Sequence, residues 1–233
     1  MKYFACFLMA ISTLLHAETY TAKLGDTNVK IIRQMGKGKT FVHLHENEHT
    51  AFQAAKMYIA REGGSLIALK HSGNRNIVFH LHKQRYEFDP NRIFTDTGIK
   101  KTLKKFGSYS PEAHQEVKKF ANKIISLLPA KGKVIAVHNN RGYSLKEYLP
   151  HHSLARDAKA LNYVPCTSYR NFYFVTKNQE YQRLKKLKFN VALQSDHATD
   201  DGSLSYYLGH KNYINIEAAF YALKQQLKML YNA

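Results

Sequence analysis

Hydrophobic residues recur along the chain in two rhythms, and the alternation between them predicts the fold class. Short runs rich in β-branched and aromatic residues, typical of strands, occupy residues 28–32, 40–44, 65–69, 77–81, 134–137, 171–175, 191–193 and 213–216. Helical periodicity occupies residues 48–61, 110–128, 179–187 and 217–230. Strands that alternate with helices predict an α/β sandwich built on a mixed β-sheet flanked by helices.

No internal repeat, low-complexity tract or Pro/Gly-rich linker interrupts this alternation, so we expect residues 18–233 to form one domain. The clearest helix follows Ser110, a capping residue, with Pro111 in its first turn. Two polar loops dotted with His, Asp and Gly, residues 149–163 and 195–205, are better candidates for the walls of a site than for linkers.

Residues 1–17 have the pattern of a secretory signal peptide: Lys2, an apolar run, then the small residue Ala17 at a cleavage point. The run is shorter than the roughly 20 residues that span a bilayer. We therefore favour a periplasmic or secreted protein, without stable membrane insertion, over an uncleaved anchor or a buried N-terminal helix. Cleavage would remove Cys6 and leave Cys166 alone, which excludes an internal disulfide.

The net charge of +18, from 35 Lys and Arg against 17 Asp and Glu, predicts an anionic partner, because the summed field concentrates anions around the protein. The basic residues are scattered and no nucleic-acid recognition motif accompanies them, so we expect no nucleic-acid partner. The competing interpretation is a polyanion binder whose stacking surfaces are Tyr143, Tyr148, Tyr206 and Tyr207.

The densest cluster of imidazoles and carboxylates follows the apolar run at 40–44. In a His-x-x-Glu spacing the imidazole leaves the strand end while the carboxylate lies in the first helical turn, so both can reach one zinc ion. Two registers fit, His43 with Glu46 and His45 with Glu48, and strand alternation does not choose between them. Solvated charges at the start of a helix are the alternative explanation.

Two other apolar runs end in polar residues of similar type. His138 follows the run at 134–137, and Glu217 follows the run at 213–216. Open α/β sheets place their sites at the carboxyl ends of strands, so His138 is a candidate third metal ligand. Glu217 is a candidate general base for the attacking water. A structural histidine and a carboxylate that favours a helix dipole are the alternatives.

Four motifs, taken in order, resemble a known superfamily. They are His-Glu-Asn-Glu at 45–48, Arg-Tyr at 85–86 with Asp-Pro-Asn-Arg-Ile-Phe at 89–94, His-Asn-Asn at 138–140 and Ile-Glu-Ala at 216–218. The set resembles the zinc carboxypeptidase superfamily and is most similar to its succinylglutamate desuccinylase and aspartoacylase branch. The resemblance implies a zinc-carboxypeptidase-like (phosphorylase/hydrolase-like) sandwich. It further implies one zinc ion per chain, bound by His45, Glu48 and His138, with Glu217 as general base and acid.

The same resemblance implies that Asn91 and Arg92 grip a substrate carboxylate and that Arg85 polarises the scissile carbonyl. The planar fork of arginine pairs bidentately with a carboxylate. One donor beside an oxyanion contributes on the order of 3 kcal/mol to transition-state stabilisation. Ion pairs of these arginines with Glu87 or Asp89 are the structural alternative.

The chain departs from the branch at three points. Glu46 stands where the branch has Gly, which adds a charge beside the metal, and Pro90 stands where it has Leu. Arg85 lies one residue nearer to the Asn-Arg pair than the branch pattern would place it.

Export and the carboxylate-reading residues together predict a function. We expect a zinc carboxypeptidase or amidase that cleaves an amide bond next to a free carboxylate, on peptidoglycan peptides or other acidic peptides. An N-acyl amino acid deacylase and a non-catalytic module that binds an anionic ligand are the alternatives. The acidic cluster of Asp196, Asp200 and Asp201 either caps a helix or faces the substrate.

Overall fold

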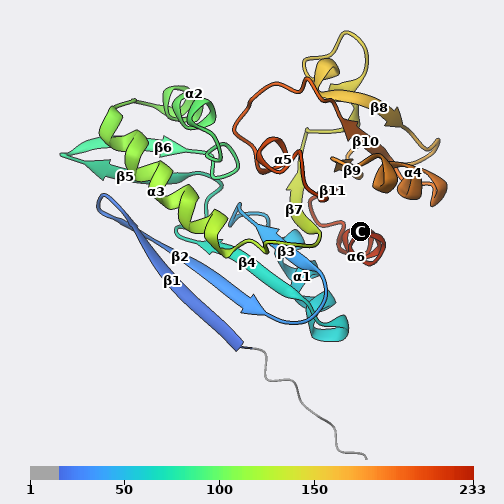
Figure 1. Cartoon of the computed structure of the whole chain (residues 1–233), viewed down its shortest axis with the longest axis horizontal. Helices are drawn as coiled ribbons and strands as arrows, with labels where there is room; N and C mark the ends of the chain where they lie inside the picture. The colour runs from blue at the N-terminus through green and yellow to red at the C-terminus, as the bar shows by residue number, and fades with distance from the viewer. Residues whose placement is uncertain (1–15) are drawn as a thin grey trace, which may run out of the picture.

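A nine-stranded mixed sheet organises residues 16–233, the part of the chain that this computed structural model describes (Figure 1). The strand order is β1-β2-β4-β3-β7-β11-β9-β10-β8. In chain order the strands are β1 (His16–Leu24), β2 (Thr27–Met35), β3 (Thr40–His43), β4 (Ser65–Lys70), β7 (Val134–Asn140), β8 (Ala158–Asn162), β9 (Phe172–Val175), β10 (Val191–Gln194) and β11 (Tyr213–Ala219). A separate hairpin pairs β5 (Ile77–Leu81) with β6 (Gln84–Phe88).

The centre of the sheet is parallel and its outer strands are mostly antiparallel. Strands β4, β3, β7 and β11 run parallel to one another, so their carboxyl ends meet at one edge. Every residue of β7 is buried, as a central strand covered on both faces requires. The candidate site residues on β7 and β11, and those that follow β3, therefore lie on the buried central strands of the sheet.

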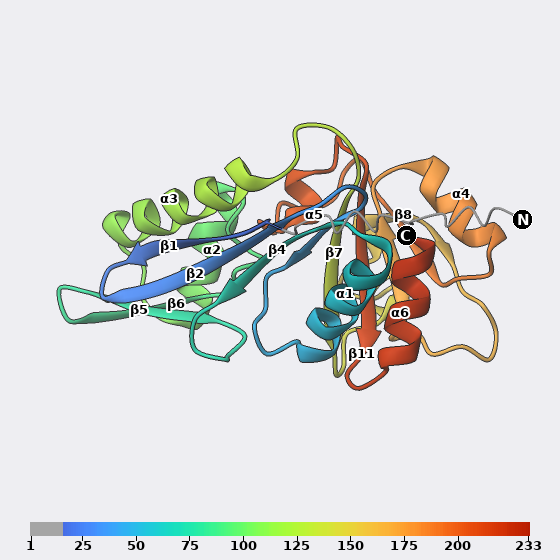
Figure 2. The same ribbon diagram turned by 90° about the horizontal axis from the view of Figure 1, so that it is seen from below.

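Helices cover both faces of the sheet. Figures 1 and 2 show α1 and α6 side by side on one face, with α3 on the other. Alternate residues of the central strands supply the two cores: Phe41 packs with the helical Ala54 and Met229, while Val42 packs with Phe120. The helical segments are α1 (His49–Glu62), α2 (Asp96–Phe106), α3 (Pro111–Leu127), α4 (Asn178–Lys186), α5 (Leu204–Tyr207) and α6 (Leu223–Asn232), with the 3₁₀ turns η1 (Leu145–Tyr148) and η2 (Ala155–Asp157).

The mixed α/β architecture predicted from the sequence is confirmed, and all eight predicted strands are present, each shifted by a few residues at most. The cap at Ser110 is also confirmed, because its Oγ accepts the backbone N–H of Ala113 at 3.1 Å. Strands β1, β6 and β8 and helices α2 and α5 have no counterpart among the predicted elements.

The predicted helix over residues 217–230 is wrong at its start. Strand β11 continues to Ala219, and the helix begins only at Leu223. The reason is pairing: residues 217–219 continue the parallel ladder with residues 138–140 of β7, which outweighs the helical preference of the two alanines. Glu217 is therefore held within a sheet rather than at a helix terminus.

The predicted signal peptide lies almost wholly outside the described residues. Its last two residues, His16 and Ala17, stand at the start of β1, paired with Met35 and Gln34. Among residues 16–233, no helix combines the length and the apolar character needed to cross a membrane. Cys166 is an exposed free thiol.

Candidate metal centre and its cavity

The side chains of two histidines and one glutamate converge beside the central strands β3 and β7. His45 follows β3, Glu48 lies directly before α1, and His138 is in β7; each side chain is at most 3% exposed. The Nδ1 atom of His45 lies 2.9 Å from Glu48 Oε1, and Nδ1 of His138 lies 3.0 Å from Glu48 Oε2. The two Nδ1 atoms are 3.2 Å apart. These residues could hold a metal ion.

The spacing of these atoms fits a small tetrahedral ion. Two nitrogens bound to zinc at about 2.0–2.1 Å with a tetrahedral angle would lie roughly 3.3 Å from each other. The observed separation of 3.2 Å between the two imidazole nitrogens is close to that value. Nitrogen, nitrogen and carboxylate oxygen are also the donor set of a common catalytic zinc site with one open position.

A second layer of hydrogen bonds fixes the orientation of His45. Its Nε2 donates to Asp89 Oδ1 at 2.7 Å, which leaves Nδ1 to face the other two ligands. Burial alone would lower the pKa of His45, but the carboxylates of Asp89 and Glu48 outweigh it and raise the pKa to about 9. A position that stabilises an imidazolium so strongly also favours a metal cation.

The other register of the His-x-x-Glu pattern does not converge. The chain turns after β3, where the backbone N–H of Glu48 donates to the carbonyl of His45, and His43 Nε2 donates to the Glu48 carbonyl at 3.0 Å. Glu46 points toward another loop, where its Oε2 accepts the backbone N–H groups of His71 at 2.6 Å and Gly73 at 2.8 Å. The extra carboxylate at 46 therefore holds the loop between β4 and β5.

That loop carries Arg75, a residue that sequence reasoning missed. Its Nη1 donates to Glu48 Oε1 at 2.7 Å and its Nη2 to Asp89 Oδ2 at 3.2 Å. The Arg75 side chain is 46% exposed and lines the cavity. Arg85, the predicted carbonyl-polarising residue, pairs with Glu87 and lies outside this cavity. The structure thus places Arg75, rather than Arg85, beside the candidate ligands.

Glu217 stands beside His138, its partner in the parallel ladder, and only 7% of it is exposed. Its Oε1 accepts Asn215 Nδ2 at 3.1 Å and its Oε2 accepts Asn140 Nδ2 at 3.2 Å. Burial raises the pKa of Glu217, and the net shift stays upward although His138 opposes it. A carboxylate whose pKa is moved toward neutral pH is suited to take and return a proton.

The predicted carboxylate readers follow Asp89 on one wall of the cavity. The side-chain Oδ1 of Asn91 accepts the backbone N–H of Leu204 at 3.0 Å, and Arg92 Nη1 donates to the Asn91 carbonyl at 2.8 Å. Arg92 also lies 3.6 Å from Asp201 Oδ2, and its side chain is 39% exposed. Gly202 makes this packing feasible, because its φ is +73° and a Cβ there would lie 2.5 Å from the Arg92 carbonyl oxygen.

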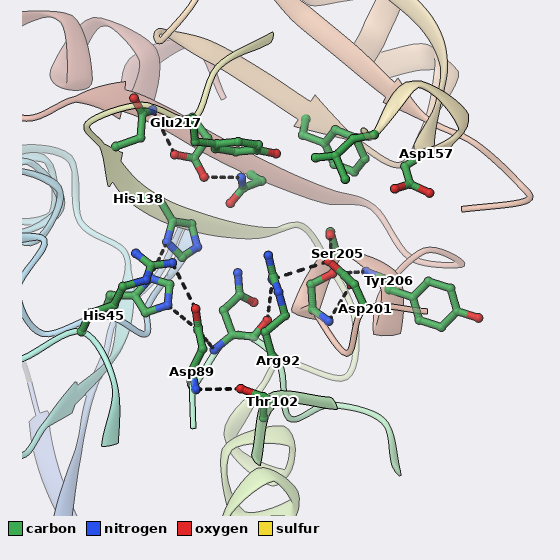
Figure 3. Close-up of a pocket in the computed structure, with 18 of the residues that line it drawn as sticks. His45, Asp89, Arg92, Thr102, His138, Asp157, Asp201, Ser205, Tyr206 and Glu217 are labelled. Carbon is green, nitrogen blue, oxygen red and sulfur yellow. Dashed lines mark hydrogen bonds and ion pairs between the residues drawn. The ribbon is translucent and has the colours of Figure 1, made fainter. Parts of the chain in front are cut away.

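The candidate ligands, Glu217, Asn91 and Arg92 line one cavity of about 690 Å³. Figure 3 shows His45 and His138 at one end, Arg92 near the middle and Asp157 at the far end. Both polar loops that the sequence marks as candidate walls contribute lining residues, among them Leu154 and Asp157 from one and Thr199, Asp201 and Ser203 from the other.

The tyrosines and the acidic cluster are also placed. Tyr143, Tyr148 and Tyr206 line the cavity, and Tyr207 packs near Phe94, so the four do not form an exposed stacking surface. In the acidic cluster, Asp201 faces the cavity, Asp200 accepts the Thr95 hydroxyl at 2.7 Å beside α2, and Asp196 is exposed and pairs with Lys159.

Fold and site together define an α/β protein with a buried candidate metal centre of two histidines and one glutamate. Among solved structures, the chain is similar to a "putative metallopeptidase" from Shewanella amazonensis, with 9% sequence identity and a TM-score of 0.41 over 93% of this chain and 83% of that one. Neither protein-family models nor curated proteins give a match. No family is assigned at this level of similarity, so function has to be inferred from the site.

Proposed function

We propose that this protein is an exported, zinc-dependent hydrolase that cleaves an amide or peptide bond next to a free carboxylate of its substrate. The observation that carries the proposal is the buried cradle of His45, Glu48 and His138, which opens into a cavity that also holds Glu217 and Arg92. Zinc held by these three residues would act as a Lewis acid and would make water more acidic.

Glu217 has the environment of the proton carrier. It would accept a proton from the attacking water on Oε1 or Oε2 and return it to the leaving amine. The side-chain amides of Asn140 and Asn215 each donate to one oxygen of Glu217. Each Glu217 oxygen keeps a second lone pair that can take a proton, so both hydrogen bonds can hold the carboxyl group in its ionised and its protonated form. Burial raises the pKa of Glu217 and so brings it nearer to neutral pH.

Two arginines would each stabilise one negative charge of the substrate during the reaction. Arg75 lies against Glu48 and would stabilise the oxyanion that develops as water adds to the carbonyl. Arg92, farther along the cavity, would bind the free carboxylate, assisted by the amide N–H of Asn91, whose Oδ1 is already engaged by Leu204. Asp201 holds Arg92 near this wall until a substrate carboxylate replaces or joins it.

The substrate class follows from size, charge and place. A cavity of about 690 Å³ is within the range that holds a small ligand or the end of a peptide. The net charge of +18 favours anionic substrates, and export would bring the enzyme to peptidoglycan peptides or other acidic peptides outside the cytoplasm.

The proposal is tested by turnover of N-acyl dipeptides and muropeptides with the zinc-loaded protein. We expect release of the terminal residue, and we expect Glu217→Gln to lose at least 100-fold in kcat while keeping its zinc. Glu62→Gln, on an exposed helix end, is the matched control and should behave like the wild type. An active Glu217→Gln protein would contradict the role of Glu217 as proton carrier. Ligand binding by the wild type without any turnover would contradict the hydrolase and favour the non-catalytic module.

A further inference from the structure

The cavity continues well beyond the residues that the proposed reaction uses. From Glu217 and Asn215 on β11 its floor passes over Phe174 on β9 to Gln194 at the end of β10. Two strand spacings separate β11 from β10, which is about 10 Å. Gln194 pairs in register with Ala158, which directly follows Asp157, so the two cavity-lining side chains lie on adjacent segments. We call this end, formed by Leu154, Asp157, Tyr148, Phe174 and Gln194, the far subsite.

Two acceptor groups of the far subsite, Gln194 Oε1 and the Asp157 carboxylate, are not fully satisfied by the described residues. Gln194 is 8% exposed, and its Oε1 has no hydrogen-bond partner among the described residues. Asp157 Oδ1 accepts the backbone N–H of Thr199 at 2.7 Å, but within residues 16–233 its carboxylate forms no ion pair with a Lys or Arg. A buried acceptor without a donor, such as Gln194 Oε1, is costly, and the half-buried Asp157 has no basic partner among the described residues, so this end of the cavity can receive donors from a ligand.

The approach to these acceptors is apolar. The rings of Tyr148 and Phe174 stack with centroids 5.1 Å apart, and Leu154 packs against the same cluster. Such walls suit the methylene groups of a side chain but offer nothing to a short polar one. Aromatic faces also attract a cation at close range.

The charges on the opposite wall show which part of a substrate belongs here. Lys101 and Lys105 of α2 line the cavity together with Thr102, which Figure 3 shows on the side of Asp89 and Arg92. Anionic groups are therefore attracted to that wall, whereas Asp157 would repel them. Asp157 is the one charged side chain among the five that form the far subsite, whereas the protein as a whole carries a net charge of +18.

We propose that the far subsite binds the side chain of the substrate residue that carries the free carboxylate, and that this side chain is long and ends in a primary ammonium. The proposal rests on the proposed function. A lysine-like diamino acid matches it: its methylene chain contacts Tyr148 and Leu154, and its ammonium donates to Asp157 and Gln194. An ammonium carries three donors on one compact atom, so it can donate to more than one acceptor at once.

The experiment compares benzoylglycyl-lysine, benzoylglycyl-norleucine and benzoylglycyl-glutamate as substrates of the zinc-loaded full-length protein. We expect kcat/KM for the lysine substrate to exceed that for norleucine by about 10- to 100-fold, with glutamate the poorest. In Asp157→Asn the lysine-to-norleucine ratio should fall at least fivefold. Asp196→Asn, which changes an exposed carboxylate outside the cavity, should keep the wild-type ratio.

Calorimetric binding of free lysine and free norleucine separates this proposal from the proposed function. If turnover is absent but lysine binds more tightly than norleucine, and Asp157→Asn removes the difference, the subsite stands and the hydrolase does not. Equal kcat/KM for lysine and norleucine, or binding that shows no preference for lysine, overturns the subsite whether or not the protein is a hydrolase.

Discussion

The two ends of the cavity are built in opposite ways. At the metal end the carboxylates are already engaged: Glu48 accepts hydrogen bonds from Arg75 and from the backbone of Asn139, and Asp89 accepts them from His45 and Arg75. At the far end, the described residues leave Gln194 Oε1 without a donor and the Asp157 carboxylate without a basic partner. The first arrangement could hold one metal ion, and we infer that the second is completed by a ligand.

The metal end is carried by central strands, whereas the far end is carried by elements near the edge of the sheet. His138 and Glu217 are on adjacent central strands, and His45 and Glu48 on a turn that the same core holds. Asp157 is on a short 3₁₀ turn, and Gln194 ends a strand one position from the sheet edge. Substitutions at the metal end should therefore affect metal and rate, whereas those at the far end should affect substrate choice.

The largest expected effect is the difference in kcat/KM between the Arg75→Ala and Arg85→Ala variants. Arg75→Ala should lower kcat/KM by roughly 100-fold or more, because it removes the donor nearest to the candidate ligands. Arg85→Ala removes an exposed ion pair with Glu87 and should change kcat/KM less than threefold. Steady-state kinetics of both variants on one dipeptide decide the matter; the reverse order of effects would return the role to Arg85.

The next effect concerns the hydrogen bond behind His45. Asp89→Asn replaces the charged acceptor of His45 Nε2 by a neutral one, so zinc affinity should fall by about 10- to 100-fold. Competition with a calibrated chelator measures it. Asp96→Asn changes an exposed carboxylate elsewhere and serves as the control. Unchanged affinity in Asp89→Asn would mean that His45 is not held as a ligand.

A smaller effect is expected from Glu46, whose carboxylate holds the loop between β4 and β5. Glu46→Gln weakens the two hydrogen bonds to His71 and Gly73 and should lower kcat about fivefold through misplacement of Arg75, with zinc content unchanged. Combined with Arg75→Ala, it should add almost nothing, since residues that act through one another are not additive. A full additional loss in the double variant would show that Glu46 acts elsewhere.

The smallest expected effects are changes in the free energy of unfolding, which should differ between substitutions at the far end and at the metal end of the cavity. Gln194→Leu removes an acceptor that has no partner, so the free energy of unfolding should stay within about 1 kcal/mol of the wild type or rise. Asn139→Ala, at the metal end, loses bonds to the Ala51 backbone at 2.7 Å and to Gln226 at 2.9 Å and should cost about 1–3 kcal/mol. Urea unfolding measures both, and equal losses would remove the distinction between the ends.

The sequence predicts the metal end far better than the far end, for physical reasons. His138 and Glu217 directly follow apolar runs, so the rule that sites lie at strand ends places them together. Arg75 lies in the polar stretch His-Ser-Gly-Asn-Arg, which has no periodicity, and it reaches the site through tertiary contacts: Glu46 holds its loop, and Glu48 and Asp89 accept its hydrogen bonds. Asp157 and Gln194 meet through sheet pairing between β8 and β10, which no local pattern encodes.

The fold divides similarly. Strands with continuous apolar runs are found from sequence, as in β5, whose observed bounds are the predicted ones. Helix α2 was not predicted, because its most hydrophobic buried residues are only Ile99 and Leu103 among lysines and small residues. Strand β6 contains charged residues at alternate positions, so only its pairing with β5 identifies it as a strand.

Metal content is the measurement that tests the central claim most directly. Elemental analysis of the purified protein should find about one zinc ion per chain, and His45→Ala and His138→Ala should each lose it while His43→Ala, whose imidazole contacts backbone, retains it. Folded protein that takes up no metal after incubation with zinc, or zinc that survives both ligand substitutions, would contradict the account.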